Sequence, residues 1–251
     1  MRIPIIRGII DRRILVNYRV EPDVLARMLP NPFRPKLING SGMAGVCLIR
    51  LKHIRPRFLP SFFGISSENA AHRIAVEWNQ NGEQKEGVFI PRRDTSSRLN
   101  AMLGGTLFPG EHHHAAFDVK EHDDHYRIVL DSDDLKTHLL VEGFSASELP
   151  KTSVFGSIKE ASDFFERGAL GYSVTSKPGE FDGLELRSAG WHVTPLAIDK
   201  VESSFFDDRT LFPPGSIQFD CALLMRGIDH EWHGKESLHA DRGLLISASA
   251  S

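Results

Sequence analysis

The sequence predicts an α+β fold, mainly β, built on a curved, barrel-like antiparallel sheet with a few short peripheral helices. Three observations predict it. Apolar and polar residues alternate with a period of two along much of the chain, as in half-buried strands. Polar turn residues separate consecutive alternating runs, as in hairpins. Helical patterns are few, short and irregularly spaced, which disfavours a parallel sheet of alternating strands and helices.

The strands follow from alternation and from the turns between them. Residues 71–78 alternate most clearly and end at Asn81-Gly82, a pair that favours the positive φ angles of a tight reversal. The polar run 121–124 separates two further alternating stretches in the same way. Strands are therefore expected at 13–20, 43–52, 71–78, 87–90, 115–120, 125–130, 135–141, 186–193 and 216–225.

Three short helices are expected, at 21–29, 96–103 and 157–168. Pro22 suits the first turn of a helix and Pro30 stops the first one. The third has the strongest signal, because Ser157 and Glu160 form a capping box in which each side chain satisfies a free backbone N–H. Gly168 is expected to end it.

Length and composition indicate an ordinary water-soluble protein. A chain of 251 residues with 41% hydrophobic and 25% charged residues fits one domain, 1–251, and needs no structural metal. A net charge of −3 gives no basic footprint for nucleic acid, and no apolar run approaches the length of a membrane span. The two cysteines lie in apolar runs, which favours free thiols and a cytoplasmic location.

The run Glu111-His112-His113-His114 is the first group that could carry chemistry. In an extended segment, His112 and His114 share one face, and two imidazoles so placed can help to chelate a divalent metal if a third ligand joins them. They can also contact a ligand directly. The alternative is a solvated strand in which one histidine donates to a backbone carbonyl.

Two more groups are rich in polar side chains. Adjacent residues of a strand point to opposite faces, so only one of Arg92 and Arg93 can enter a cavity and bind a carboxylate or phosphate. The alternative for these arginines is a surface ion pair. Glu68 is a candidate general base, or equally a loop acid, and His72 lies on an apolar face where a histidine is usually a core residue.

The basic run 50–58, followed by Phe62 and Phe63, could bind single-stranded nucleic acid through phosphate contacts and stacking. The alternative, a solvated loop, is favoured because the rest of the chain is acidic. No nucleophile elbow, Walker motif, dinucleotide fingerprint or Cys-x-x-Cys pair is present. The sequence therefore predicts no cofactor, and it does not support acyl-transfer, ATP-dependent, NAD-dependent or redox activity.

Three stretches of the chain resemble a known family. Residues 16–30 (VNYRVEPDVLARMLP), 91–95 (PRRDT) and 201–208 (VESSFFDD) look like the YqjF-like bacterial family of unknown function. That family is similar to acetoacetate decarboxylase in fold. The resemblance implies a curved, mainly antiparallel, barrel-like sheet, in agreement with the alternation.

The decarboxylase pattern matches residues 18–32 and 94–111, with one decisive departure. Phe108-Pro109 is present, but Gly110 and Glu111 stand where the resemblance places the Schiff-base lysine and its neighbouring lysine. Glycine has no amine to condense with a β-keto acid, so classical Schiff-base decarboxylation is not expected. The cavity glutamate of that family falls close to Ala71 or His72, where an imidazole is available instead.

The sequence therefore predicts a cavity for a small anionic organic molecule, with lyase- or hydrolase-type acid–base chemistry if the protein is an enzyme. A non-catalytic metabolite-binding module and a metal-dependent enzyme using His112 and His114 are the alternatives, and a homo-oligomer stays open. The candidate catalytic residues are His72, Glu111 and Glu68, and the candidate binding residues are Arg92, Arg93, His112 and His114.

Overall fold

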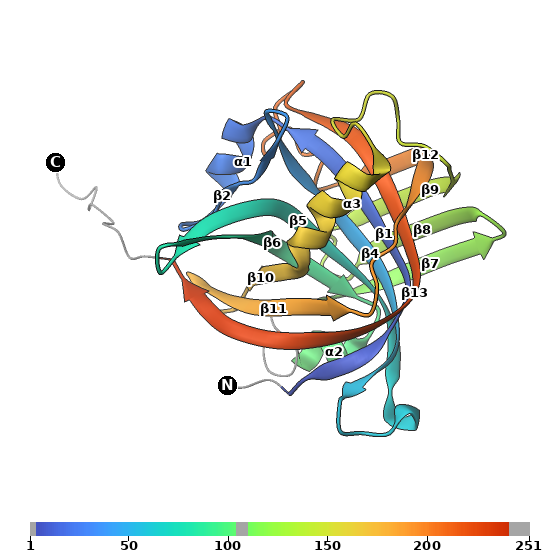
Figure 1. Ribbon diagram of the computed structural model, residues 1–251. Helices are drawn as coiled ribbons and strands as arrows, with labels where there is room; N and C mark the ends of the chain where they lie inside the picture. Colours follow the sequence, from blue (N-terminus) through green and yellow to red (C-terminus); the bar gives the residue numbers. More distant parts are fainter. Residues whose placement is uncertain (1–3, 104–109, 241–251) are drawn as a thin grey trace.

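One 13-stranded sheet carries the fold (Figure 1). The computed structural model describes residues 4–103 and 110–240. Its strands are β1 (Ile6–Val20), β2 (Arg34–Pro35), β3 (Leu37–Ile38), β4 (Ser41–Pro56), β5 (Ile65–Gln80), β6 (Glu83–Thr95), β7 (His113–His122), β8 (His125–Ser132), β9 (His138–Ser145), β10 (Leu170–Val174), β11 (Glu180–Ser188), β12 (Thr194–Ser203) and β13 (Ile217–His239). The helices are α1 (Pro22–Met28), α2 (Arg98–Leu103) and α3 (Ile158–Glu166), with 3-10 turns η1 (Ser61–Phe63) and η2 (Arg167–Ala169).

The sheet closes on itself in two places. Its order is β11-β10-β6-β7-β8-β9-β12-β13-β1-β4-β5-β2, and β11 also pairs with β13 while β6 also pairs with β5. One closed circuit therefore runs through β13, β1, β4, β5, β6, β10 and β11. Two pairings, β6 with β7 and β6 with β10, are parallel, and the others are antiparallel. The expected curved, mainly antiparallel sheet is confirmed, although it is not a regular barrel.

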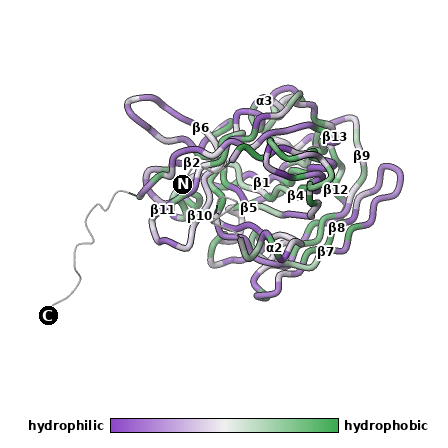
Figure 2. The backbone as a smooth tube through the Cα atoms, turned by 90° about the horizontal axis from the view of Figure 1, so that it is seen from below, coloured by the Kyte–Doolittle hydropathy of each residue, from purple (hydrophilic) through white to green (hydrophobic). Residues whose placement is uncertain are grey.

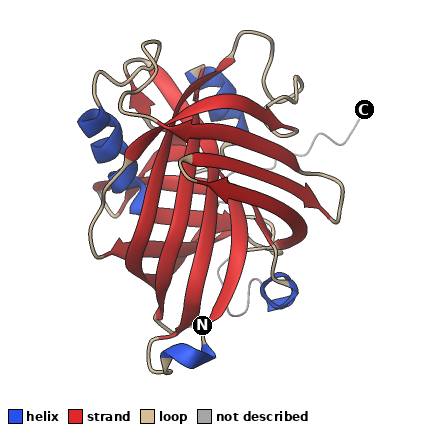
Figure 3. Ribbon diagram, turned by 90° about the vertical axis from the view of Figure 1, so that its right-hand side faces the viewer, coloured by secondary structure: helices blue, strands red, loops and turns tan. Residues whose placement is uncertain are grey.

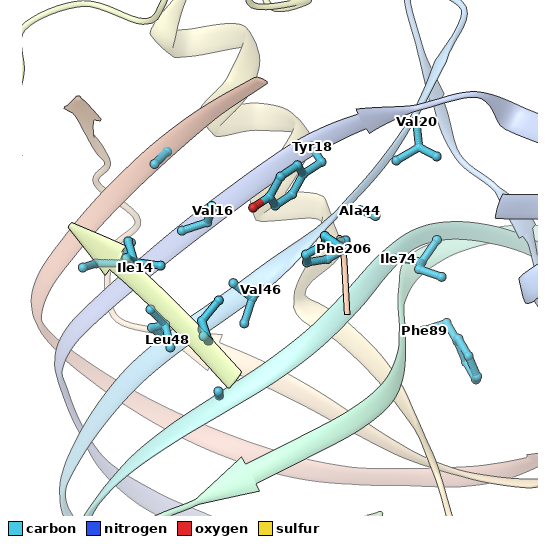
Figure 4. Close-up of a cluster of buried hydrophobic side chains, with 14 of the residues drawn as sticks. Ile14, Val16, Tyr18, Val20, Ala44, Val46, Leu48, Ile74, Phe89 and Phe206 are labelled. Atoms are coloured by element: carbon cyan, nitrogen blue, oxygen red, sulfur yellow. The ribbon is translucent and has the colours of Figure 1, made fainter. Parts of the chain in front are cut away.

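Two apolar clusters explain why several strands read as continuous hydrophobic runs. The first gathers Ile14, Val16, Val46, Leu48 and Ile74 on one face of β1, β4 and β5 (Figure 4). The second lies on the other face, where α3 packs against these strands. Both faces of the central strands are therefore buried, and in Figure 2 the hairpins that project from the body are largely hydrophilic.

The short helices lie outside the strands (Figure 3). Asp23 stands in the first turn of α1, and the helix ends before Pro30, as expected. At α3 the Ser157 Oγ accepts from the backbone N–H of Glu160 at 3.1 Å. The Glu160 carboxylate accepts from Gly156 N at 2.7 Å, one residue earlier than the standard box. The described residues contain no helix long and apolar enough to cross a membrane.

Most strand predictions are confirmed in place but are too short, and one is wrong. The reversal after β5 has positive φ at Asn81 (55°) and Gly82 (81°), as the Asn-Gly pair predicts. The strand expected at 186–193 is wrong, because β11 ends at Ser188 and β12 begins at Thr194. The sequence predicts no strand at β10, which begins two residues after Gly168, the expected end of the third helix.

Candidate functional site: an arginine-lined cavity

Two adjoining hollows lie inside the closed circuit of strands, and together they form what we call the arginine cavity. They share five lining residues, Ile49, Ala71, Arg93, Leu184 and Trp232. Their volumes are about 60 and 100 Å³. Each is several times the space that one water molecule needs, so the cavity has room for a small organic molecule.

Strand register brings the polar lining together. Cys47 on β4, Ala71 on β5 and Arg93 on β6 are direct neighbours across the sheet. Arg73 lies two residues after Ala71 on β5, so it points to the same face. Arg13 on β1 pairs with Ile49, two residues after Cys47, and it joins the same face. Three arginines from three strands therefore line one cavity.

Arg13 is held by neutral groups. Its Nε donates to Cys47 Sγ at 3.2 Å, and its guanidinium lies 5.5 Å from the centre of the Trp191 ring. Its Nη1 is buried and has no hydrogen-bond partner among the described residues. Arg13 forms no ion pair within the described part of the chain.

Arg73 is buried, and it too is held by neutral groups. Its Nη2 donates to Asn17 Oδ1, and its guanidinium lies 4.9 Å from the centre of the Phe165 ring on α3. The Nε is buried without a hydrogen-bond partner in the described residues. Burial lowers the pKa of Arg73 to about 10, and the charge of Arg13 adds to that effect.

Arg93 lies where the two hollows meet. Its Nε donates to Ser173 Oγ at 2.9 Å. Burial lowers the pKa of Arg93 to about 10, so the guanidinium still carries its charge at neutral pH. It stays partly accessible because it lines the cavity. Within residues 4–103 and 110–240, none of Arg13, Arg73 and Arg93 is paired with a carboxylate.

His112 supplies an imidazole to the first hollow. Its Nδ1 lies 3.1 Å from the Gly110 carbonyl oxygen, which can only accept, so Nδ1 carries the ring proton. Burial, followed by the charge of Arg93, lowers the pKa of His112 to about 3. At neutral pH the ring is therefore neutral, with Nε2 as its basic nitrogen.

Two amides complete the first hollow. Asn69 on β5 donates to the Ile49 carbonyl and contacts Ser67. Asn100 on α2 is buried, and its Oδ1 has no hydrogen-bond partner among the residues described. An unsatisfied buried acceptor is costly, and a hydroxyl or N–H of a bound molecule would satisfy it.

Arg92 lies on the opposite face of β6 from Arg93. It binds Asp94 at 2.7 Å and Asp134 at 2.9 Å. Asp94 is fully buried, and burial raises the pKa of its carboxyl while Arg92 opposes the rise. Asp94 also borders the first hollow, but its carboxylate is bound to Arg92. The structure thus separates the arginine pair into one paired residue and one that lines the cavity.

His72 also lies away from the cavity, directly paired with Arg92 across β5 and β6. Its ring is fully buried, 4.8 Å from that of Phe205 and 5.8 Å from that of Phe206. Burial, with Arg92 as the second cause, lowers the pKa of His72 to about 3. Ala71, the other position matched to the decarboxylase glutamate, lines the cavity.

Glu68 belongs to an ion network on the face of β5 that His72 shares. It binds Arg12 at 2.6 Å and also contacts Arg50. Arg12 is fully buried and binds a second carboxylate, that of Glu121. A carboxylate held by two arginines accepts hydrogen bonds from both, and it lies outside the residues that line the cavity.

The histidine run is divided by the start of β7. β7 begins at His113, so Glu111 and His112 precede the strand that contains His113 and His114. Glu111 is exposed, and His114 Nδ1 lies 2.8 Å from Asp133. His112 and His114 therefore have different surroundings. The residues described contain no group of three His, Cys, Asp or Glu side chains that could hold a metal ion.

Gly110 has no room for a side chain. Its φ is +81°, and a Cβ there would overlap the Cβ of Ser173. A lysine at this position would meet both obstacles. Phe108-Pro109, the other part of the decarboxylase pattern, lies outside the described residues.

Sequence reasoning missed Arg13 and Arg73. The alternation of 71–78 assigns Arg73 to the face opposite the apolar one, which would be solvent-exposed in a one-sided sheet. One signal could have identified it. Residues 43–49 are apolar on both faces, so the neighbouring strands of that segment are covered on both sides as well.

Comparison with known proteins supports the fold and leaves the activity open. A model of the family DUF2071, described as an uncharacterized conserved protein, matches residues 10–216. No curated protein matches the sequence significantly.

Solved structures of similar shape include acetoacetate decarboxylases and an enzyme of enduracididine biosynthesis. The acetoacetate decarboxylase of Legionella pneumophila aligns with a TM-score of 0.62 at 12% identity, over 93% of this chain and 87% of that one. An acetoacetate decarboxylase-like enzyme from Sphingomonas wittichii RW1 gives 0.58 at 11% identity, over 95% and 93%. The enduracididine biosynthesis enzyme MppR, complexed with the condensation product of pyruvate and imidazole 4-carboxaldehyde, gives 0.63 at 10%, over 97% and 92%. At these identities the likeness shows an acetoacetate decarboxylase-like fold.

Proposed function

The chain belongs to the DUF2071 family of uncharacterized conserved proteins, and on that premise we propose that its arginine cavity binds a small anionic organic molecule. One observation carries the proposal. Arg13, Arg73 and Arg93 line a single cavity, and within the described residues no carboxylate compensates them. The solved structures of this fold include enzymes, and MppR is complexed with a product of pyruvate, which supports a small organic acid as ligand.

The physical reason is the cost of burying charge. A buried guanidinium without a counter-charge is strongly destabilising, so proteins pair it with a carboxylate or use it to bind an anion. An anionic ligand would supply the missing charge and accept hydrogen bonds from the planar forks. The free thiols of Cys47 and Cys221 support a cytoplasmic protein, where such metabolites occur.

If the protein is an enzyme, its chemistry runs without a Schiff base and uses His112 as the proton acceptor. Gly110 has no room for the lysine, and His112 presents a neutral ring to the cavity. Arg93 depresses the pKa of His112, so an anion bound to Arg93 would offset that charge and make the imidazole more basic. Binding would thereby activate the base for a lyase- or hydrolase-type proton transfer.

A non-catalytic binding module is the second candidate, and one observation favours it. The only carboxylate side chain that borders the cavity among the described residues is Asp94, which Arg92 already binds. The cavity therefore offers donors and charge but little acid–base equipment. The variant His112→Gln separates the two candidates, because a module keeps its affinity and shows no turnover in either form.

The first experiment is a thermal-shift screen of small carboxylates, keto acids, sugar acids and phosphates. A ligand at about 100 times its dissociation constant adds roughly 2.7 kcal/mol of stability, which raises Tm by roughly 5–10 °C for a chain of this size. The variant Arg93→Gln should lose the shift. Arg34→Gln is the matched control, because Arg34 is exposed and lies 3.7 Å from Glu77 at the surface.

Arg93→Gln also has a second signature. Without ligand it should be as stable as the wild type or more stable, because it removes a buried charge that has no counter-charge. A loss of ligand response together with a retained or raised Tm excludes misfolding as the cause. An anion response of equal size in Arg93→Gln, or no response to any anion in the wild type, would contradict the proposal.

A further inference from the structure

The arginine cavity also carries information about the charge of its ligand. Resting on the proposed function, we infer that the ligand is at least doubly negative, as a phosphate monoester or a dicarboxylate is. Its uncharged part would lie in the first hollow and carry a hydroxyl or N–H donor. Three features support this: the charges of the lining, its free donors, and the contrast with another buried arginine of the same chain.

The lining is strongly one-sided in charge. The second hollow is bordered by Arg13, Arg73 and Arg93 and by no acidic residue among those described. The first hollow adds only Asp94, whose carboxylate Arg92 binds from the other face. A ligand with one negative charge would therefore leave two of the three guanidiniums uncompensated. A doubly negative ligand removes most of this cost.

The hydrogen-bond donors lead to the same conclusion. Each guanidinium has five N–H groups, and the groups that hold these three are a thiol, an amide and a hydroxyl, all neutral. Arg13 Nη1 and Arg73 Nε are buried and without partners in the described part of the chain. Several acceptor oxygens are needed to use these donors. Phosphate offers three terminal oxygens and a dicarboxylate four.

Arg12 is another buried arginine of this chain, and unlike the arginines of the cavity it is paired with carboxylates. Arg12 is fully buried on the other face of β1, and it is bound by Glu68 and Glu121. Two carboxylates thus form ion pairs with the one guanidinium of Arg12, whereas the three guanidiniums around the cavity form no ion pair within the described residues. The contrast within one strand, between Arg12 and its neighbour Arg13, indicates that the missing negative charges come with a ligand.

The first hollow fits the uncharged part of such a ligand. Asn69 and the neutral His112 line it beside apolar side chains of β4. Asn100 Oδ1 is buried there without a partner among the residues described, so it can accept a hydrogen bond from a hydroxyl or N–H. The ligand class is therefore a phosphorylated or dicarboxylic compound that also carries a donor group.

The test compares probes of matched shape that differ by one charge. Succinate is compared with succinamate, and methyl phosphate with dimethyl phosphate, by isothermal titration at pH 8, where methyl phosphate is a dianion because its second pKa is about 6. The second negative charge would accept charge-assisted hydrogen bonds from the guanidinium donors, so the doubly charged member of at least one pair should bind about tenfold tighter or more. The pair with the larger ratio distinguishes a phosphate ligand from a dicarboxylate.

Variants test whether the cavity causes the ratio of affinities between the doubly and singly charged probes. Arg13→Gln and Arg73→Gln should each lower it, because each removes one charge that the second negative group would contact, while the surface variant Arg34→Gln should leave it unchanged. Equal affinities within both pairs, with binding still lost in Arg93→Gln, would overturn the inference and leave the proposed function standing. Absence of binding by all four probes, together with a negative anion screen, would overturn both.

Discussion

His72 offers a direct test of whether this histidine titrates as a buried core residue. The perturbation is acid, with His72→Leu as the variant. The ring lies fully buried against Phe205 and Phe206, and both of its nitrogens lack hydrogen-bond partners in the described residues. Burial and Arg92 lower its pKa from 6.5 to about 3 in the folded protein. Between these values the unfolded chain binds a proton that the folded chain excludes.

The sign and size of the effect follow from linkage. Because the folded pKa is depressed, stability is complete above pH 6.5 and is lost as the pH falls through the window from 6.5 to 3. Each such histidine removes about 1.4 kcal/mol between pH 7.5 and 5.5. His112 and His230 behave alike, with pKa values lowered by burial to about 3 and about 4. The three together predict a loss of about 4 kcal/mol.

The assay is urea unfolding at pH 7.5 and 5.5, followed by the fluorescence of the three tryptophans. The wild type should lose about 4 kcal/mol and His72→Leu about 3 kcal/mol over this interval. At pH 7.5 the variant should be at least as stable, since leucine leaves no unsatisfied ring nitrogens in the aromatic cluster. An equal loss in both proteins would contradict this prediction, because His72 would then titrate in the folded state as it does in the unfolded chain.

Two further predictions concern Gly110 and His112. Gly110→Ala should destabilise the protein by about 2–5 kcal/mol, because of its positive φ and the overlap with Ser173. The control Gly215→Ala has φ +86° but nothing within 4 Å, so it should cost only about 1–2 kcal/mol in urea unfolding. Equal losses of stability in the two variants would contradict the overlap at Gly110. Burial and Arg93 lower the pKa of His112 to about 3 in the free protein, and this pKa should rise when an anion binds Arg93. NMR titration of the ring with and without ligand measures the rise. An unchanged titration in the presence of a bound anion would mean that the anion does not contact Arg93.

Local chemistry determines the elements that the sequence could predict. Turn residues with positive φ place the reversal at Asn81-Gly82, and Ser157 places the start of α3, because both signals depend on a few neighbouring residues. The strand at 186–193 could not be placed. Its limits depend on pairing with residues of β13 that lie more than 40 positions later in the chain, such as His230 opposite Ser188, and no local pattern encodes that pairing.

The site shows the same division between local and distant information. Alternation establishes that Arg92 and Arg93 point to opposite faces, but which face holds the cavity depends on β10 and β11 closing the circuit. Alternation places Arg73 on a solvent-exposed face, because the sequence of β5 does not indicate that α3 covers this face. Arg13 escapes notice for a similar reason, since its neighbours Cys47 and Trp191 come from distant segments.

The two adjacent arginines on β6 have different electrostatic surroundings. Arg92 is compensated by Asp94 and Asp134, so its charge stabilises the face that it occupies. Arg93 donates only to Ser173 among the described residues, and it remains charged next to two further guanidiniums. Selection for stability alone would favour a neutral residue there. Retaining the charge lowers stability. On the proposed function, a bound anion would offset this cost, so raised stability together with lost binding in Arg93→Gln would be the most direct support for that function.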